Sequence, residues 1–191
     1  MIKVLLPITI FFLFCNASYS QKLKYDAIKK KIFFEEVFNI NDSQKDQIAD
    51  QVWLWINENI SDSSLKYQDD QTGEFVIKTS NNFLNPIGPD YKVKVWYEMS
   101  IFTEDNSVSY KISKLIFENM VLQDGNWESH KIPAEKMLVG VGYYQPNGRP
   151  KRLSELYNNE TQRIIYQVSS NLKQFLHSHL PDSELADIRN N

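Results

Sequence analysis

The sequence offers few residues for general acid–base catalysis at neutral pH, because it contains only three histidines. Glu128 and His130 lie two residues apart and would share one face of a strand, so they form a conceivable general acid/base pair. No serine occurs in a G-x-S-x-G sequence, and nothing completes a catalytic triad. We therefore interpret the pair as polar residues on an exposed strand. The alternative is a hydrolase with Glu128 and a second carboxylate about 5–9.5 Å apart in a cleft.

His177 and His179 suggest a metal site, with Asp182 and Glu184 as further oxygen ligands. Residues two apart on an α-helix point about 200° apart, so one ion reaches both rings only if the helix has unwound. Histidines also suit the C-terminal end of a helix, where they can bond to free carbonyl oxygens. We adopt this helix-end interpretation and predict neither a metal nor another cofactor.

Three further segments match ligand-binding motifs poorly. Asp69, Asp70 and Glu74 lack the alternating oxygen ligands of a calcium loop. Gly140-Val141-Gly142 lacks the third glycine and the strand-to-helix context of a dinucleotide-binding loop. The basic segment 148–152 could meet an anionic headgroup or phosphate, but we interpret it as a solvated loop before a helix.

The strongest candidate for a functional site is a surface rather than a motif. From Tyr91 to Phe102 the side chains alternate, and the apolar set that begins with Tyr91 and Val93 is predicted to face the core. The opposite set would form the open face of a sheet: Lys92, Lys94, Trp96 and Phe102, joined by Lys111. Aromatic rings beside cations on a solvated sheet suit a peptide, glycan or protein partner. In the alternative, residues 120–150 fold over these rings and bury them.

A strand and a helix are predicted first along the chain. Alternation over 30–40 predicts a strand, with Ile32, Phe34, Phe38 and Ile40 on one face and Glu36 interrupting that face. Asp42 or Ser43 is then expected to cap a helix. Its apolar stripe contains Ile48, Val52, Trp55, Ile56 and Ile60. Trp53 and Trp55 could stack on a sugar, but we interpret both as core residues.

Four strands and a long helix are predicted next. Two short strands flank a turn at Gly73, and two longer ones cover 91–102 and 108–117. The apolar parity shifts near Lys114, which predicts a β-bulge there. Residues 120–150 are expected to form an irregular ornament with one or two short strands. A second helix is predicted from Leu153 to His179, followed by a flexible tail over 181–191.

The first 20 residues are typical of a secretory signal peptide. Lys3 precedes an apolar stretch of about 11 residues, too short for a membrane-spanning helix, which needs ~20 residues, and small residues suit cleavage after Ser20. We expect no transmembrane anchor and a periplasmic or secreted protein. The alternative is a lipoprotein anchored through Cys15, although Phe14 stands where lipoprotein processing wants a small residue.

The length of the chain, together with the lack of an internal repeat or a long linker in the sequence, predicts one domain over 30–180, preceded by an N-terminal lead over 21–29. The chain has 191 residues, a net charge of −3 and one cysteine. Loss of residues 1–20 removes Lys3 and Cys15 and leaves 20 basic and 24 acidic side chains, a balance of −4. An acidic chain disfavours a nucleic-acid partner, and a chain without cysteine must be stabilised by its core alone.

The predicted order of strand, helix, four strands and helix suits an antiparallel α+β sheet with both helices packed on one face. This order resembles the TATA-binding-protein-like (TBP-like) fold. Over roughly 30–120 the sequence is similar to a domain-of-unknown-function family of exported Bacteroidota proteins. The similar segments are the opening strand Ile32–Ile40, the helix entry Asn41–Gln44 leading into Val52–Ile56, the acidic turn before Gly73, and the paired strands Val93–Phe102 and Val108–Phe117.

The resemblance implies the fold and an envelope or secreted location, and it implies no catalytic residues. DNA binding by the fold's namesake does not carry over, since fold does not specify function. We therefore expect a non-enzymatic cell-envelope module that binds an unknown protein, peptide or glycan through the open face of its sheet. The alternatives are an envelope-polymer hydrolase and a structural module of a larger envelope assembly.

Overall fold

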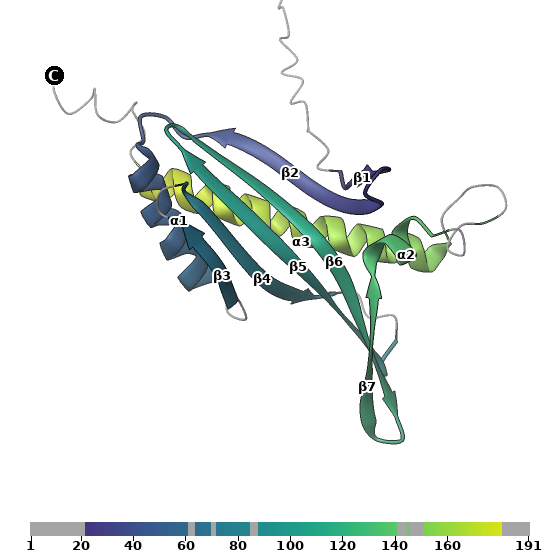
Figure 1. Ribbon diagram of the computed structural model, residues 1–191. Coiled ribbons are helices and arrows are strands. Elements are labelled where there is room, and N and C mark those ends of the chain that lie inside the picture. Colours follow the sequence, from purple (N-terminus) through teal and green to yellow (C-terminus); the bar gives the residue numbers. More distant parts are fainter. Residues whose placement is uncertain are drawn as a thin grey trace, which may run out of the picture.

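The computed structural model describes residues 22–60, 64–69, 72–84, 88–140, 145 and 151–180, with the side chains of 64–67 left out. An antiparallel sheet carries α1 and α3 on one face and leaves the other face open, as the TBP-like prediction requires (Figure 1). The strands are β1 (Lys24–Asp26), β2 (Lys31–Asn39), β3 (Ser64–Asp69), β4 (Glu74–Asn82), β5 (Tyr91–Glu104), β6 (Ser107–Gln123) and β7 (Asn126–Pro133). The helices are α1 (Lys45–Asn59), α2 (Ala134–Leu138) and α3 (Arg152–His179).

The strands lie in the order β1-β2-β6-β5-β4-β3, and β7 also pairs with β6. β6 therefore has two neighbours on one side, β2 along its first half and β7 along its second half. The predicted signal peptide, Cys15 and the tail lie outside the described residues, as does most of the basic segment 148–152.

The predicted bulge at Lys114 is confirmed, and it lies where β6 changes partner. Lys114 has a φ of 54°, and Lys114 and Leu115 together face the single residue Tyr97. One extra residue reverses the face to which all later side chains point. The bulge therefore keeps the apolar residues of both halves of β6 on the helix side, where all five are buried: Val108, Tyr110, Ile112, Leu115 and Phe117.

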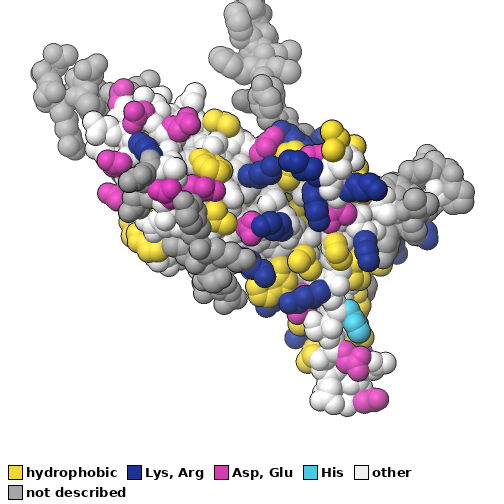
Figure 2. Space-filling model, viewed as in Figure 1, with side chains coloured by type: hydrophobic (Ala, Val, Ile, Leu, Met, Phe, Trp, Pro, Cys, Tyr) yellow, Lys and Arg dark blue, Asp and Glu magenta, His cyan; other side chains and the backbone are white. Residues whose placement is uncertain are grey.

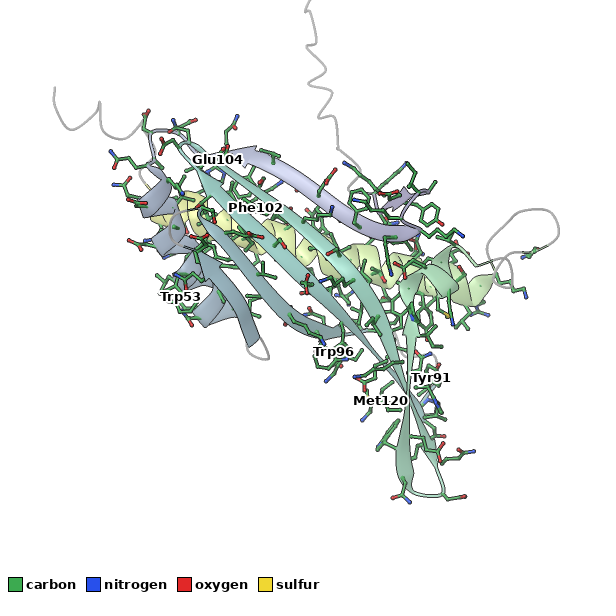
Figure 3. All side chains as sticks on the ribbon, viewed as in Figure 1. Trp53, Tyr91, Trp96, Phe102, Glu104 and Met120 are labelled. Atoms are coloured by element: carbon green, nitrogen blue, oxygen red, sulfur yellow. The ribbon has the colours of Figure 1, made fainter. Side chains whose placement is uncertain are left out.

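The helical stripe of α1 is confirmed by burial. Ile48, Val52, Trp55 and Ile56 are buried, and Trp55 Nε1 donates to Asn171 Oδ1 of α3 at 2.5 Å. The interpretation of Trp53 as a core residue is wrong, because its side chain is exposed (Figure 3). Two residues correspond to about 200° around a helix, so Trp53 and Trp55 point in nearly opposite directions.

The predicted N-cap of α1 is also wrong, because Gln44 caps the helix. The backbone N–H of Gln44 donates to Gln47 Oε1 at 3.2 Å. Ser43 is instead used in the preceding turn, where its hydroxyl donates to the Asn41 carbonyl and its N–H donates to Asn106 Oδ1. Asp42 takes a left-handed conformation, with φ of 51°, rather than the extended backbone of an N-cap.

Two elements differ from the sequence-based expectation at the edges of the sheet. Residues 24–26 form β1 within the predicted lead and pair with β2, although three residues are too few to show alternation. Within 120–133 the expected short strand is present as β7, but it returns beside a β6 that continues to Gln123, so this part is a regular hairpin rather than an irregular ornament. Among the described residues, no helix is long and apolar enough to cross a bilayer.

Candidate functional site on the open face of the sheet

All five residues predicted for the open face lie on it. Lys92, Lys94, Trp96 and Phe102 alternate with the buried residues of β5, and Lys111 of β6 pairs with Ser100 on the same face. Figure 2 shows lysine side chains gathered over this face together with hydrophobic ones. Antiparallel partners project to the same side of a sheet, so the strand register brings residues from β2, β4, β6 and β7 to this surface as well.

Trp96 is the centre of a cluster that four strands build. The ammonium groups of Lys78, Lys94 and Lys131 lie 5.6, 5.4 and 5.3 Å from the centroid of its ring. Each distance is within the range of a cation–π contact, which contributes about 0.5–1 kcal/mol at an exposed site. Glu118 of β6 completes the group by accepting the Trp96 Nε1–H at 2.6 Å. We call these five residues the tryptophan cluster.

The environment of Glu118 keeps its side chain charged. The pKa of this carboxyl is lowered, chiefly by the hydrogen bond from Trp96 and then by the one from Ser129 Oγ at 2.7 Å. Lys131, at 4.0 Å from Glu118 Oε1, and the nearby Lys94 lower the pKa further. The cluster therefore holds three cations and one carboxylate at neutral pH.

The lowered pKa predicts how the cluster responds to acid. A hydrogen bond to the carboxylate form is present above the ordinary pKa of 4.5 and is lost as the pH falls through the lower, folded-state value. The Trp96 Nε1–H resonance is therefore expected to stay constant between pH 7 and 5 and to shift with a midpoint below 4.5. An NMR titration of the indole resonances tests this, with Trp127 as the internal control. A Trp96 midpoint above 4.5 contradicts the assignment.

A second aromatic–lysine contact lies near the tip of the β6–β7 hairpin. Lys92 Nζ is 4.3 Å from the centroid of the Trp127 ring. Trp127 remains 42 % exposed, so the contact leaves ring surface open to solvent. This pair extends the tryptophan cluster toward the hairpin.

A shallow depression of about 390 Å³ lies at the other end of the open face. Val37, Phe102, Ser109 and Lys111 are among the residues that line it. Phe102 is 38 % exposed, and Lys111 lies 4.6 Å from the centroid of the Phe33 ring. Phe102 and Lys111 thus both line this depression, while Lys94 and Trp96 belong to the tryptophan cluster.

Positive charge on the open face is only partly neutralised. Lys24 pairs with Glu35 at 3.2 Å and Lys114 pairs with Glu98 at 2.6 Å. Within the described part of the chain, four other lysines of this face make no ion pair: Lys78, Lys92, Lys94 and Lys111. The face is therefore locally cationic on a chain whose net charge is −3.

The described part of 120–150 does not cover this surface. β7 is hydrogen-bonded beside β6 in the same sheet, and the hairpin projects away from the body (Figure 1). α2 contacts α3 and the strands from the helix side. Trp96 is half-buried, three lysine ammonium groups lie close to its ring, and none of the described segments lies over it. Phe102 and Met120 are labelled on the same sheet in Figure 3.

The other candidate groups do not assemble into a catalytic site among the described residues. Glu128 and His130 lie 4.0 Å apart, but every residue from Leu122 to Lys131 is exposed, so no cleft excludes water around them. His179 Nδ1 lies 2.8 Å from the Phe175 carbonyl oxygen, which agrees with the helix-end interpretation. No three His, Cys, Asp or Glu residues group together within the described ranges.

Sequence reasoning missed four members of this surface. Lys78 alternates with the apolar residues of β4 and could have been assigned by parity. Glu118 could also have been assigned by parity once the bulge was predicted, whereas Lys131 and Trp127 carried no usable signal, since their position depends on the pairing of β6 with β7. Glu118 follows the bulge, which moves it onto the open face beside Lys94.

The comparisons with known proteins identify a fold and no activity. A family model described as "Domain of unknown function (DUF4468) with TBP-like fold" matches residues 34–118. A TBP-like protein from Parabacteroides distasonis has a similar crystal structure, with a TM-score of 0.60, 15 % identity and coverage of 76 % of this chain and 92 % of that one. A DUF4468 family protein from Bacteroides ovatus also has a similar crystal structure, with a TM-score of 0.61, 16 % identity and coverage of 80 % of this chain and 89 % of that one. No curated protein matches this sequence.

Proposed function

We propose that this protein, whose residues 34–118 match the model of DUF4468, a domain of unknown function with a TBP-like fold, is a non-enzymatic module that binds a partner through the open face of its sheet. The observation that carries the proposal is the tryptophan cluster, in which three lysines surround one ring on a face that no described segment covers. Solvated sheet faces do not need such an arrangement for stability, because surface charge contacts contribute little.

The chemistry of the face suits binding better than proton transfer. A general acid or base works best when its pKa is close to the working pH. Glu118, the carboxylate at the centre, has a pKa shifted down and so further away from neutrality. Lysines and aromatic rings supply charge and contact area, which are the properties of a docking surface.

We also propose that the protein acts outside the cytoplasm. The support is the signal-like composition of residues 1–20, where Lys3 precedes the apolar stretch that ends near Phe14. Intact-mass measurement of protein from the native envelope tests this proposal. A chain that begins near Gln21 is expected, a diacylated Cys15 would replace cleavage after Ser20 with lipid anchoring, and a retained Met1 in soluble cytoplasmic protein would contradict export.

Photocrosslinking in the native host tests the binding proposal. A photoreactive amino acid at Ser100 or Phe102 is expected to give one shared adduct, because both side chains lie on the open face. The matched position is Tyr166 on α3, which is exposed on the opposite side and is expected to give none. The double variant Lys94→Ala/Trp96→Ala should lose the adduct while retaining the thermal unfolding temperature. Adducts from Tyr166 alone, or a collapse of thermal stability in the double variant, would contradict the proposal.

A further inference from the structure

The charge and spacing of the open face identify the class of partner, an inference that rests on the proposed function. We propose that the face binds an acidic polypeptide segment in extended conformation, seated across the tryptophan cluster and Lys92. The occupant is thus a stretch of chain with aspartate or glutamate on one side, rather than a sugar polymer or a membrane.

The charge of the open face favours an acidic partner. Lys78, Lys92, Lys94 and Lys111 make no ion pair with the described residues, so their charges are available to a ligand. The only carboxylate inside the tryptophan cluster, Glu118, is engaged by two hydrogen bonds. A partner that carries several carboxylates would neutralise this surface, whereas a basic partner would add to its charge.

The Trp96 ring already has lysine side chains against it. Three ammonium groups already lie within 5.6 Å of its centroid, and the side chain is half-buried. A ring that is covered by lysine side chains does not present a bare face for stacking against a sugar. Trp96 instead acts as a platform that holds the lysines in place, which lowers the entropy they lose when an anion binds.

The spacing of the lysines matches that of side chains along an extended peptide. Lys92 and Lys94 are two residues apart on β5, so their Cα atoms are about 6.7 Å apart. Lys94, Glu118 and Lys131 lie in register across β5, β6 and β7, which separates the Cα atoms of the two lysines by about 9–10 Å. An extended peptide also repeats its same-side chains every ~6.7 Å. Alternate acidic residues of such a peptide can therefore meet Lys92 and Lys94 in succession.

The hairpin tip argues against an anionic membrane as the partner. Asp124 is exposed in the turn between β6 and β7, and Figure 2 shows acidic side chains at the end of the hairpin. If the open face lay flat on anionic headgroups, the projecting turn would bring the Asp124 carboxylate close to them, whereas Glu128, which pairs with Val121, points to the other face of the sheet. Repulsion between like charges would then oppose the contact.

Titration with poly-L-glutamate of about 20 residues, followed by calorimetry, tests the inference. Wild-type protein is expected to bind it with an affinity that falls as salt is raised. The Lys94→Gln/Lys131→Gln variant should bind about tenfold more weakly, since each exposed ion pair is worth up to about fivefold in affinity. The matched control, Lys136→Gln/Arg152→Gln, removes two exposed charges from α2 and α3 and should stay within about twofold of wild type.

Four outcomes overturn the acidic-peptide assignment. Tighter binding of polygalacturonate than of polyglutamate would indicate a glycan, and an equal loss in both double variants would indicate nonspecific attraction. Self-association that disappears in Lys94→Gln/Lys131→Gln would indicate that a second copy occupies the face. Absence of polyglutamate binding also overturns it, and the crosslinks from Ser100 and Phe102 then decide whether the proposed function survives. If those crosslinks are absent as well, both proposals fail.

Discussion

Replacement of Phe117 by alanine is expected to lower the free energy of unfolding by about 3–5 kcal/mol. Phe117 is 0 % exposed and lies at the centre of an aromatic group on the helix side of the sheet. Its ring centroid is 4.7 Å from that of Tyr157 and 6.0 Å from that of Phe83, both in edge-to-face geometry. The substitution removes these contacts and leaves a cavity, and both effects destabilise the folded state.

The cavity left by Phe117→Ala cannot close readily, because Tyr157 is held in place. Its hydroxyl donates to Asn119 Oδ1 at 2.6 Å, and both residues are buried. Phe102→Ala is the matched control, since it makes the same chemical change on the open face and should cost less than about 1 kcal/mol. Urea denaturation of both variants provides the measurement. Similar losses from the two substitutions would mean that the bulge does not direct Phe117 into the core.

Gly73→Ala is expected to destabilise the protein by about 3 kcal/mol, from backbone strain together with overpacking. Gly73 has a φ of 70°, which costs about 1–2 kcal/mol for a residue with a Cβ. An added Cβ would lie 2.3 Å from Thr103 Oγ1 and 2.8 Å from the Thr103 carbonyl oxygen. Because the Thr103 N–H donates to the Gly73 carbonyl at 2.9 Å, relief of this clash would stretch the connection between the two segments.

Gly125→Ala separates the cost of backbone strain from the cost of overpacking in the Gly73→Ala variant. Gly125, in the turn between β6 and β7, has a φ of 80°, and an added Cβ would meet no atom within 4 Å. This variant should therefore show the conformational cost alone, about 1–2 kcal/mol. Thermal or urea unfolding of both variants gives the comparison. An effect of Gly125→Ala as large as that of Gly73→Ala would show that steric contact at Thr103 is unimportant.

Local periodicity predicted much of this fold. The alternation of β5, the stripe of α1 and the bulge at Lys114 are patterns within a single element, and burial on one face produces each of them. The same alternation assigned Lys92, Lys94, Trp96 and Phe102 to the open face, because residues two apart on a strand share a side. These predictions needed no knowledge of which strands pair.

Glu36 shows where local pattern is insufficient. In the sequence it only interrupts the apolar face of β2. In the folded protein the Tyr110 hydroxyl donates to its Oε2 at 2.6 Å, and Lys173 of α3 pairs with its Oε1. Burial first, and then the bond to Glu36, raise the pKa of Tyr110 well above its ordinary value, so the hydroxyl remains a donor. A carboxylate at this position is accommodated only because β6 and α3 bring a donor and a cation to it.

The sequence by itself determined which side chains of β5 face solvent, because that depends on a two-residue period along one strand. Only the tertiary structure decided what surrounds them. Lys78 and Lys131 reach Trp96 from strands on opposite sides of β5, and Glu118 joins them through the register of β6. Register between strands depends on long-range pairing, which no property of one segment specifies. The alternation therefore predicted a cationic aromatic face, and strand pairing made it a cluster around one ring.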